Sequence, residues 1–181
     1  MKKYFFILSF IVVIISNITV SAQKSQNDKF PDYQFHKKGF WNVSEFTIGF
    51  RPPYYVPPFY GLSTVFGYKF SPRFTLGLGV AAVFSNNQYI IPIFVDARYY
   101  PLARRASPFI GFQLGNSTAI LQNPTTATIY KIYDGLYMSP LVGIRLYIRE
   151  RVALNFAISY QFHEYFSINA NMICMRVGAS F

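Results

Sequence analysis

The sequence predicts an all-β fold, a closed eight-stranded antiparallel up-and-down transmembrane β-barrel preceded by a cleaved signal peptide. Three observations predict it. The 181-residue chain is 52% hydrophobic and 20% aromatic, but only 13% charged. From residue 40 onward, apolar residues alternate with small or polar ones at the period of two that is typical of strands. The apolar face is nearly continuous, whereas the other face lacks the many lysines and glutamates of a water-exposed sheet.

The N-terminus has the pattern of an export signal. Lys2 and Lys3 precede an apolar run of about 12 residues, which is short of the ~20 that a spanning helix needs. The small residues of Val20-Ser21-Ala22 then predict cleavage between Ala22 and Gln23. The alternative is a membrane anchor. The predicted organisation is therefore a signal peptide over 1–22, a flexible periplasmic leader over 23–39 and an outer-membrane barrel domain over 40–181.

Eight alternating segments fill the barrel domain. The seventh is the clearest, because its even-numbered positions from Val152 to Phe162 are apolar or aromatic and its odd-numbered positions are small or polar. Each segment has about 10–12 residues, close to the ~9–11 of a tilted membrane-crossing strand. Pro92 and Pro140 each remove a ladder donor, so we expect a bulge or a strand start at these residues. The segments are roughly 40–50, 59–70, 74–85, 89–100, 108–118, 136–149, 152–163 and 170–181.

The apolar face is predicted to point outward to lipid and the small and polar face inward. A one-residue slip of register would move Arg98, Arg145 and Arg176 to the lipid side, at a cost of up to ~6–12 kcal/mol. Open sheet edges cannot lie in hydrocarbon, so the sheet must close. The alternative is a soluble β-sandwich or lipocalin-like barrel with its apolar residues inside.

The lengths of the connections between segments predict the orientation of the barrel in the membrane. The connections at Ser71-Pro72-Arg73, around Ala103-Arg104-Arg105 and at Arg149-Glu150-Arg151 are expected to be short periplasmic turns, with Phe70 opposite Phe74 and Ile148 opposite Val152. Longer external loops are expected over 51–58, 86–88, 121–134 and 163–167. The proline- and tyrosine-rich 51–58 loop and the threonine-rich 121–134 loop are interpreted as aromatic rim anchors and solvated spacers, and binding of a surface partner, glycan or lipopolysaccharide is the alternative.

Aromatic residues are expected to gather in two girdles at the rims, as in membrane barrels. The predicted periplasmic girdle contains Phe40, Tyr68, Phe70, Phe74, Tyr99 and Phe181, and the predicted outer girdle contains Phe50, Tyr60, Phe84, Tyr89, Tyr160 and Phe162.

A barrel of eight strands is just wide enough to hold its own side chains. We therefore expect a lumen filled by paired charges and hydrogen bonds, because buried charges require partners. A narrow pore or small-ligand site is the alternative. The predicted polar network of the lumen contains Glu45, Lys69, Asp96, Arg98, Gln113, Arg145, Asn155, Gln161 and Arg176.

These features together resemble the small eight-stranded outer-membrane β-barrel family, the OmpA transmembrane-domain and OmpX type. The resemblance covers residues 40–181 and rests on the signal ending at Ala22, the eight segments and the final Phe181. It implies a bacterial outer-membrane location, contact with outer-membrane lipids and lipopolysaccharide, and insertion by the barrel assembly machinery. In that family, alternate C-terminal apolar residues are part of the assembly signal, and the matching positions here are Ile173, Met175, Val177, Ala179 and Phe181.

Enzymatic function is not expected. Some small barrels modify lipid A, and Ser159, His163 and Glu164 are the local candidates, with His36 weaker still. Ser159 and His163 share a face but lie roughly 13 Å apart along a strand, beyond hydrogen-bond reach. We expect His163 to be a rim or loop residue and Cys174 a buried filler. The sequence shows no nucleotide motif and no metal motif, so no cofactor and no metal are predicted.

Nucleic acid is not an expected partner either, although the formal net charge is +10. The basic residues are scattered and the chain carries an export signal. The predicted function is a non-enzymatic outer-membrane barrel, structural or surface-interacting. A lipid-modifying barrel enzyme and a narrow pore are the alternatives.

Overall fold

The computed structural model describes residues 38–51, 58–85, 88–102, 104–122, 129–148, 152–165, 168–169 and 171–181. The predicted cleavage site at Ala22 and Gln23, the leader up to residue 37 and His36 lie outside these residues. So do Arg149 to Arg151 and most of the predicted 51–58 loop. No helix in the described part of the chain is long and apolar enough to cross a membrane.

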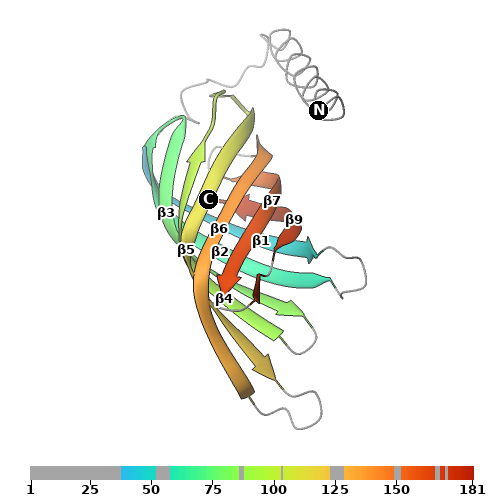
Figure 1. Ribbon diagram of the computed structural model, residues 1–181. Helices are drawn as coiled ribbons and strands as arrows, with labels where there is room; N and C mark the ends of the chain where they lie inside the picture. The colour runs from blue at the N-terminus through green and yellow to red at the C-terminus, as the bar shows by residue number, and fades with distance from the viewer. Residues whose placement is uncertain are drawn as a thin grey trace, which may run out of the picture. The chain divides into compact units, whose positions relative to one another are not determined.

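The described residues form one antiparallel sheet of eight long strands and a short one (Figure 1). Consecutive strands pair from β1 to β7, β7 pairs with β9, and β9 pairs with β1, so the sheet closes into an up-and-down barrel. The two-residue strand β8 pairs with β7 in the same register as β9 does, and therefore continues β9. The strands are β1 (Gly39–Phe50), β2 (Phe59–Ser71), β3 (Phe74–Ser85), β4 (Gln88–Tyr99), β5 (Ala106–Gln122), β6 (Ile129–Tyr147), β7 (Ala153–Tyr165), β8 (Ile168–Asn169) and β9 (Met172–Ser180).

The register fixes the dimensions of the barrel. Stepping from each residue to its paired neighbour, a path that starts at Gly39 of β1 passes once around the ring. It returns to β1 at Gly49, ten residues further along. For eight strands this stagger corresponds to a strand tilt of about 40° and a radius of about 8 Å. The path passes through Lys69, Thr75, Arg98, Gly111, Leu141, Ser159 and Cys174.

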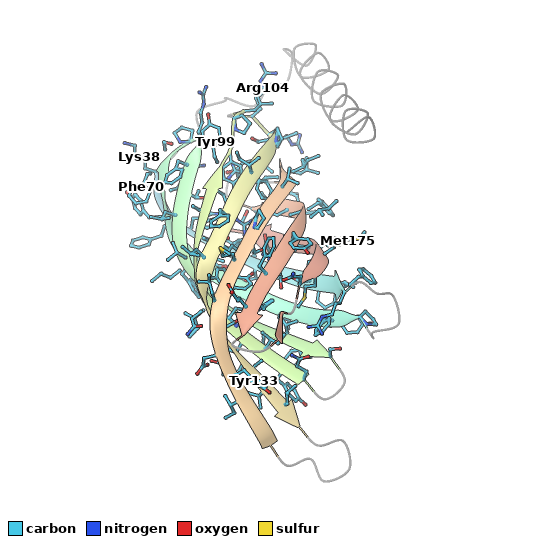
Figure 2. All side chains as sticks on the ribbon, in the orientation of Figure 1. Lys38, Phe70, Tyr99, Arg104, Tyr133 and Met175 are labelled. Carbon is cyan, nitrogen blue, oxygen red and sulfur yellow. The ribbon has the colours of Figure 1, made fainter. Side chains whose placement is uncertain are left out.

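The two ends of the barrel are distinguished by what they carry. The terminal end is the one where β1 begins and β9 ends, and it includes the β2–β3, β4–β5 and β6–β7 connections. At this end Phe181 closes the ring, since its N–H donates to the Asn42 carbonyl at 2.9 Å and its own carbonyl accepts from the Asn42 N–H at 3.2 Å. Figure 2 shows Phe70, Tyr99 and Arg104 at this end and Tyr133 near the opposite one.

The opposite end is named the ribbon end, because β5 and β6 extend there beyond their neighbours (Figure 1). These strands have 17 and 19 residues, against 12 or 13 in β1 to β4. The predicted loop over 121–134 is therefore wrong over 121–122 and 129–134, which are strand. Alternating Ile and Tyr residues continue the β-pattern past position 118, and the pairing runs to Leu121 opposite Lys131 and Gln122 opposite Ile129.

Alternation of side chains between the two faces is inverted relative to a soluble barrel. Leu78, Ile93 and Ile158 are more than half exposed on the outside, whereas Arg98, Arg145 and Arg176 are at most 3% exposed on the inside. An exterior this apolar is the surface that hydrocarbon, rather than water, solvates. Arginines on the inside and apolar residues on the outside therefore exclude a water-soluble sandwich with an apolar interior.

Three local predictions need correction. Opposite Phe74 lies Ser71, not Phe70, because the register shifts between Lys69 and Ser71. Neither proline sits at a bulge or a strand start: the register runs unchanged past Pro92, which points inward, and past Pro140. Each proline lacks a backbone N–H, and the pairing is interrupted there instead, between β3 and β4 at Pro92 and between β6 and β7 at Pro140. Ile148 does pair with Val152 as expected, through an N–H···O bond of 2.9 Å.

Connection lengths do not separate the two ends as the sequence suggested. The connections at the terminal end are 72–73, 100–105 and 148–152, and those at the ribbon end are 51–58, 86–87, 123–128 and 166–167. Each end thus has a two-residue connection and a longer one. The strand extensions absorb much of what the sequence pattern suggested were loops. The two ends differ in the extension of β5 and β6 beyond their neighbours, up to Gln122 and back from Ile129, which is called the ribbon.

Candidate functional site

The middle of the lumen holds an ion-pair network centred on Arg98. Its Nε and Nη2 donate to the two carboxylate oxygens of Asp96 at 2.9 and 3.1 Å, and its Nη1 donates to Glu45 Oε1 at 2.6 Å. The two-point contact with Asp96 uses the planar fork of the guanidinium. The rings of Trp41 and Phe109 lie 5.5 and 5.4 Å from the same guanidinium carbon, so aromatic faces complete its surroundings.

Arg176 forms the second centre of this network from β9. Its Nε donates to Ser159 Oγ at 2.9 Å and its Nη1 donates to Gln113 Oε1 at 2.9 Å. Its Nη2 lies 3.0 Å from Ser139 Oγ and 3.3 Å from the Tyr137 hydroxyl. These four hydrogen-bond partners lie on three strands, β5, β6 and β7, so Arg176 ties β9 to β5 and β6 across the lumen.

Gln113 joins the two centres. Its Nε2 donates to Asp96 Oδ2 at 2.6 Å while its Oε1 accepts from Arg176 and from the Tyr137 hydroxyl at 2.9 Å. Glu45 also lies between the two guanidiniums, with Oε2 3.6 Å from Arg176 Nη1. Two arginines thus face two carboxylates, so the middle of the lumen is balanced in charge although every member is at most 3% exposed.

The terminal end of the lumen is cationic and aromatic. The guanidinium carbon of Arg145 lies 3.5 Å from the ring centre of Tyr100 and 4.7 Å from that of Tyr147. Lys69 Nζ lies 3.3 Å from the Tyr147 hydroxyl. Asn155 is the cross-strand partner of Arg145, and both are 2% exposed. This end therefore contains cations stacked on tyrosine rings, in contrast to the paired charges of the middle.

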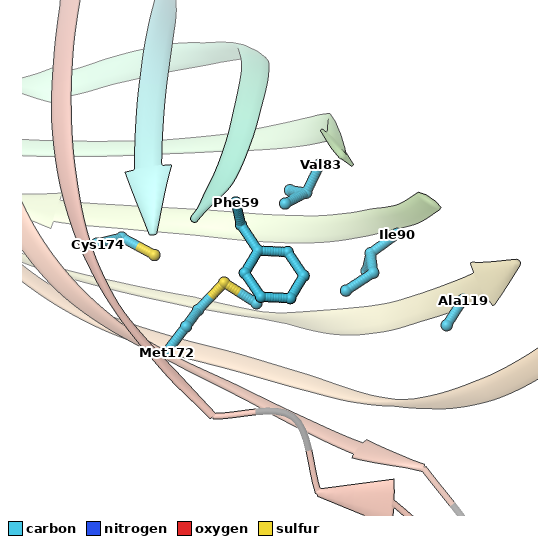
Figure 3. Packing of buried hydrophobic residues seen from close by; sticks show 6 residues of the cluster. All are labelled: Phe59, Val83, Ile90, Ala119, Met172 and Cys174. Atoms are coloured by element: carbon cyan, nitrogen blue, oxygen red, sulfur yellow. The ribbon is translucent and has the colours of Figure 1, made fainter. Parts of the chain in front are cut away.

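The ribbon end of the lumen is apolar, which the sequence did not predict (Figure 3). Phe59, Ile90 and Met172 are at most 2% exposed and pack with three smaller residues, and Tyr133 covers the group. A cavity with room for about one water molecule lies between this part and the polar middle. The predicted inward-facing filler Cys174 belongs to the cluster, which is made of Phe59, Val83, Ile90, Ala119, Met172 and Cys174.

The structure does not bring the candidate catalytic residues together. Ser159 accepts its bond from Arg176, whereas His163 Nδ1 lies 3.2 Å from Ser117 Oγ and its Nε2 lies 3.3 Å from Gln161 Oε1. His163 was expected at a rim or in a loop, and this is wrong: it lies within β7 and is completely buried against Tyr137. Strand β7 extends past residue 163, so the inward parity of this histidine places it inside the lumen.

All nine residues of the predicted polar network lie inside the barrel and are buried. The network that they form also includes residues that the sequence analysis did not select: Trp41, Tyr100, Ser117, Tyr137 and Ser139. Their position on the inward parity was a usable signal, since Tyr137 and Ser139 alternate with outward Leu136 and Met138. Among the described residues, no group of three potential metal ligands is brought together.

The predicted girdle residues all lie on the outer face, exposed or half-buried. Edge-to-face pairs join Phe40 to Tyr68 at the terminal end and Phe84 to Tyr89 at the ribbon end, with ring centres 5.8 and 5.6 Å apart. In the C-terminal strand, Ile173, Met175, Val177 and Phe181 are 46 to 59% exposed on the same face, and Ala179 is half-buried there.

Comparisons with known proteins give the same fold. No protein-family model matches the chain, and no curated protein sequence matches it significantly. The solved structure of Neisserial surface protein A matches with a TM-score of 0.65 and 10% identity over 80% of this chain and 97% of that one. OprG from Pseudomonas aeruginosa matches with a TM-score of 0.57 and 13% identity over 81% and 97%.

The N-terminal β-barrel domain of Pseudomonas aeruginosa OprF matches with a TM-score of 0.54 and 16% identity, over 80% of this chain and all of that one. At these identities the likeness concerns the fold. Together with the closed ring of eight strands and the inverted faces, it shows that the chain has the fold of the small eight-stranded outer-membrane β-barrel proteins.

Proposed function

We propose that this protein is a non-enzymatic integral barrel of the bacterial outer membrane, with a lumen filled by its own side chains and a ribbon end that offers a contact surface. The observation that supports the location best is the inversion of faces. Large apolar side chains are exposed around the barrel, while the charges of Glu45, Asp96, Arg98 and Arg176 neutralise one another inside.

Heat-modifiable migration tests the location and the closed barrel together. Outer-membrane and periplasmic fractions would be compared by electrophoresis with and without boiling, since a closed barrel stays compact in detergent until it is heated. We expect the protein in the outer-membrane fraction with a shift on boiling. Recovery from the periplasm without detergent would overturn the proposal.

A structural role for the lumen fits its closed middle and apolar ribbon end. The polar network joins strands that are not neighbours in the sheet, and the apolar cluster lies between the network and the ribbon end. A narrow pore is the alternative. Planar bilayers containing the purified protein should show no steady conductance, and reproducible unitary steps would favour the pore.

A lipid-modifying enzyme is supported less well, because Ser159 and His163 have separate partners and are 3% exposed or less. Both side chains are buried on the lumen side of β7, away from the lipid-facing surface. Ser159→Ala and His163→Ala variants should leave the lipid A profile of the cells unchanged in mass spectrometry. A changed acylation pattern would support the enzyme.

The ribbon supports a surface-interacting role. Pairing of β6 with β7 starts at Gly135 opposite Tyr165, so the segment 129–134 pairs with β5 alone among the described strands. Exposed strand edges of this kind can accept a further strand from a partner. Ile132 adds an apolar side chain that is 58% exposed.

We place the ribbon outside the cell and the terminal end in the periplasm. Trypsin added to intact cells should then cleave at Lys131, and a Lys131→Gln variant should lose that fragment while keeping its heat-modifiable migration. Cleavage that requires permeabilised cells would reverse the orientation. Interaction with lipopolysaccharide and insertion by the barrel assembly machinery, through the Ile173 to Phe181 segment, belong to the same proposal.

A further inference from the structure

The buried side-chain atoms without a hydrogen-bond partner are concentrated at the terminal end of the lumen. Those at this end are Trp41 Nε1, Thr75 Oγ1, the Tyr100 hydroxyl, Arg145 Nε and both amide atoms of Asn155, while Glu45 Oε2 lies in the middle of the lumen. All five residues are at most 8% exposed. Buried polar groups are normally satisfied, so unsatisfied ones at one end of the lumen point to a partner that the described residues do not supply.

These residues share one end of the barrel because of where they stand on their strands. Trp41 is the third residue of β1, Thr75 the second of β3 and Asn155 the third of β7, while Arg145 is two residues before the end of β6. Tyr100 follows β4 directly. All these positions belong to the terminal end, and their side chains point inward.

Most of the unsatisfied atoms at the terminal end are hydrogen-bond donors. Indole and guanidinium N–H groups, an amide NH2 and two hydroxyls can all donate, and the Asn155 carbonyl oxygen is the single obligate acceptor among the unsatisfied atoms at the terminal end. Water donates and accepts equally, so a set dominated by donors matches an acceptor-only partner better than it matches water. An oxyanion such as phosphate is such a partner.

The charges at the terminal end of the lumen also favour an anionic partner. Arg145 forms no ion pair with any described residue, and the carboxylates nearest the middle of the lumen, Glu45 and Asp96, are engaged by Arg98. The Lys69 ammonium also faces this end, on the ring of Tyr147. Tyr100 holds the Arg145 guanidinium by its face at 3.5 Å, which leaves the N–H edge available for a planar two-point contact.

We propose that the terminal end of the lumen binds a small oxyanion of the phosphate class, with Arg145 and Asn155 as its principal contacts and Tyr100, Thr75 and Trp41 as further donors. The site is separate from the ribbon and does not depend on the surface-interacting role. The anion would supply the negative charge that no described residue places beside Arg145, and so would stabilise the end of the barrel where its N- and C-terminal strands meet.

Thermal unfolding of the purified barrel in zwitterionic detergent tests the site, with inorganic phosphate as the probe at constant ionic strength set by chloride. We expect a saturable rise of the unfolding temperature, roughly 3–6 °C at ten times the dissociation constant. Arg145→Met should abolish the rise. Arg73→Gln, which removes an exposed charge from the turn at the same end, should retain it.

Asn155→Asp keeps the proposal testable if Arg145→Met does not fold. The new carboxylate would stand directly across the strand pair from Arg145 and replace the anion, so this variant should be more stable than the wild type without phosphate and should no longer respond to it. A wild type whose unfolding temperature does not respond to phosphate, or a response that persists in Asn155→Asp, would overturn the proposal.

Repeating the titration in bicelles with and without phosphatidylglycerol identifies the source of the oxyanion. A phosphate response of equal size in both assigns the site to a dissolved anion. Loss of the response in phosphatidylglycerol bicelles, with an unfolding temperature that is already raised and still depends on Arg145, assigns it to a lipid headgroup. Both results support an oxyanion site, and raised stability that does not depend on Arg145 contradicts it.

Discussion

Arg98 Nη1 and Glu45 Oε1 lie 2.6 Å apart across the lumen, on strands β4 and β1, which are not neighbours in the sheet. Neither side chain is more than 1% exposed. The contact exists because the ten-residue stagger of the closed ring brings position 45 to the depth of positions 96 and 98. It therefore reports closure of the barrel, and not only local strand pairing.

Glu45→Gln should destabilise the barrel strongly. The change leaves two guanidiniums against one carboxylate in a sealed interior, and breaking a buried ion pair from one side costs about 3–5 kcal/mol. Reversible urea unfolding in lipid bilayers would measure the free energy. The matched control is Glu164→Gln at the exposed end of β7, which should change it by less than about 0.5 kcal/mol. Equal effects of the two changes would contradict the network as described.

Ile158→Lys tests which solvent surrounds the barrel. Ile158 lies near the middle of β7 and is 56% exposed on the outer face. In a bilayer the lysine should lower the free energy of unfolding by about 2–4 kcal/mol, whereas Phe40→Lys at the rim should cost about 0–1 kcal/mol. Unfolding in bilayers of fixed composition measures both. In a water-soluble barrel Ile158→Lys would be neutral, and that result would refute the membrane assignment.

The alternation of the sequence was sufficient to predict which side chains lie inside. Because the strand period is two, knowing the face of Arg98 determines the face of Asp96 and of every other residue on that strand, and the same holds for Arg145 and Arg176. The partners of these residues were not predictable. That Arg98 meets Glu45, and Arg176 meets Ser139, depends on the stagger of the closed ring, which no single segment of sequence encodes.

The ends of the strands were the part that the sequence predicted least well. The threonine-rich stretch around 124–128 has a composition that favours a loop. It therefore outweighed the strand-like alternation of side chains that continues through Ile132 and Tyr133. The apolar cluster at the ribbon end was missed for a related reason. The sequence pattern predicts a small and polar interior along the whole barrel, whereas Phe59, Ile90 and Met172 occupy inward positions.

Gly115→Ala should disrupt pairing of β4 with β5. A methyl group at this position would meet the carbonyl oxygen of Ile93 and lie 2.6 Å from the Phe94 Cα, and neither backbone atom can move away without breaking the ladder. We expect a loss of about 1–3 kcal/mol or failure to refold. Gly61→Ala, whose nearest contact would be the Val83 side chain at 3.1 Å, should cost less than Gly115→Ala. Refolding yield into detergent measures both, and equal yields would contradict the close approach.

Thiol labelling of Cys174 distinguishes a filled lumen from a water-filled one. Cys174 is completely buried, with its sulfur beside Gly49, at the depth where the apolar cluster meets the polar network. A small methanethiosulfonate reagent should react with the folded barrel at least about a thousandfold more slowly than with the unfolded chain, because reaction requires local opening. Mass spectrometry of quenched samples gives the rates. Arg73→Cys in a Cys174→Ala background places a thiol at the exposed turn and should react at nearly the unfolded rate. Rapid labelling of Cys174 in the folded protein would mean that water reaches the middle of the lumen from the ribbon end, and would favour the pore over the filled barrel.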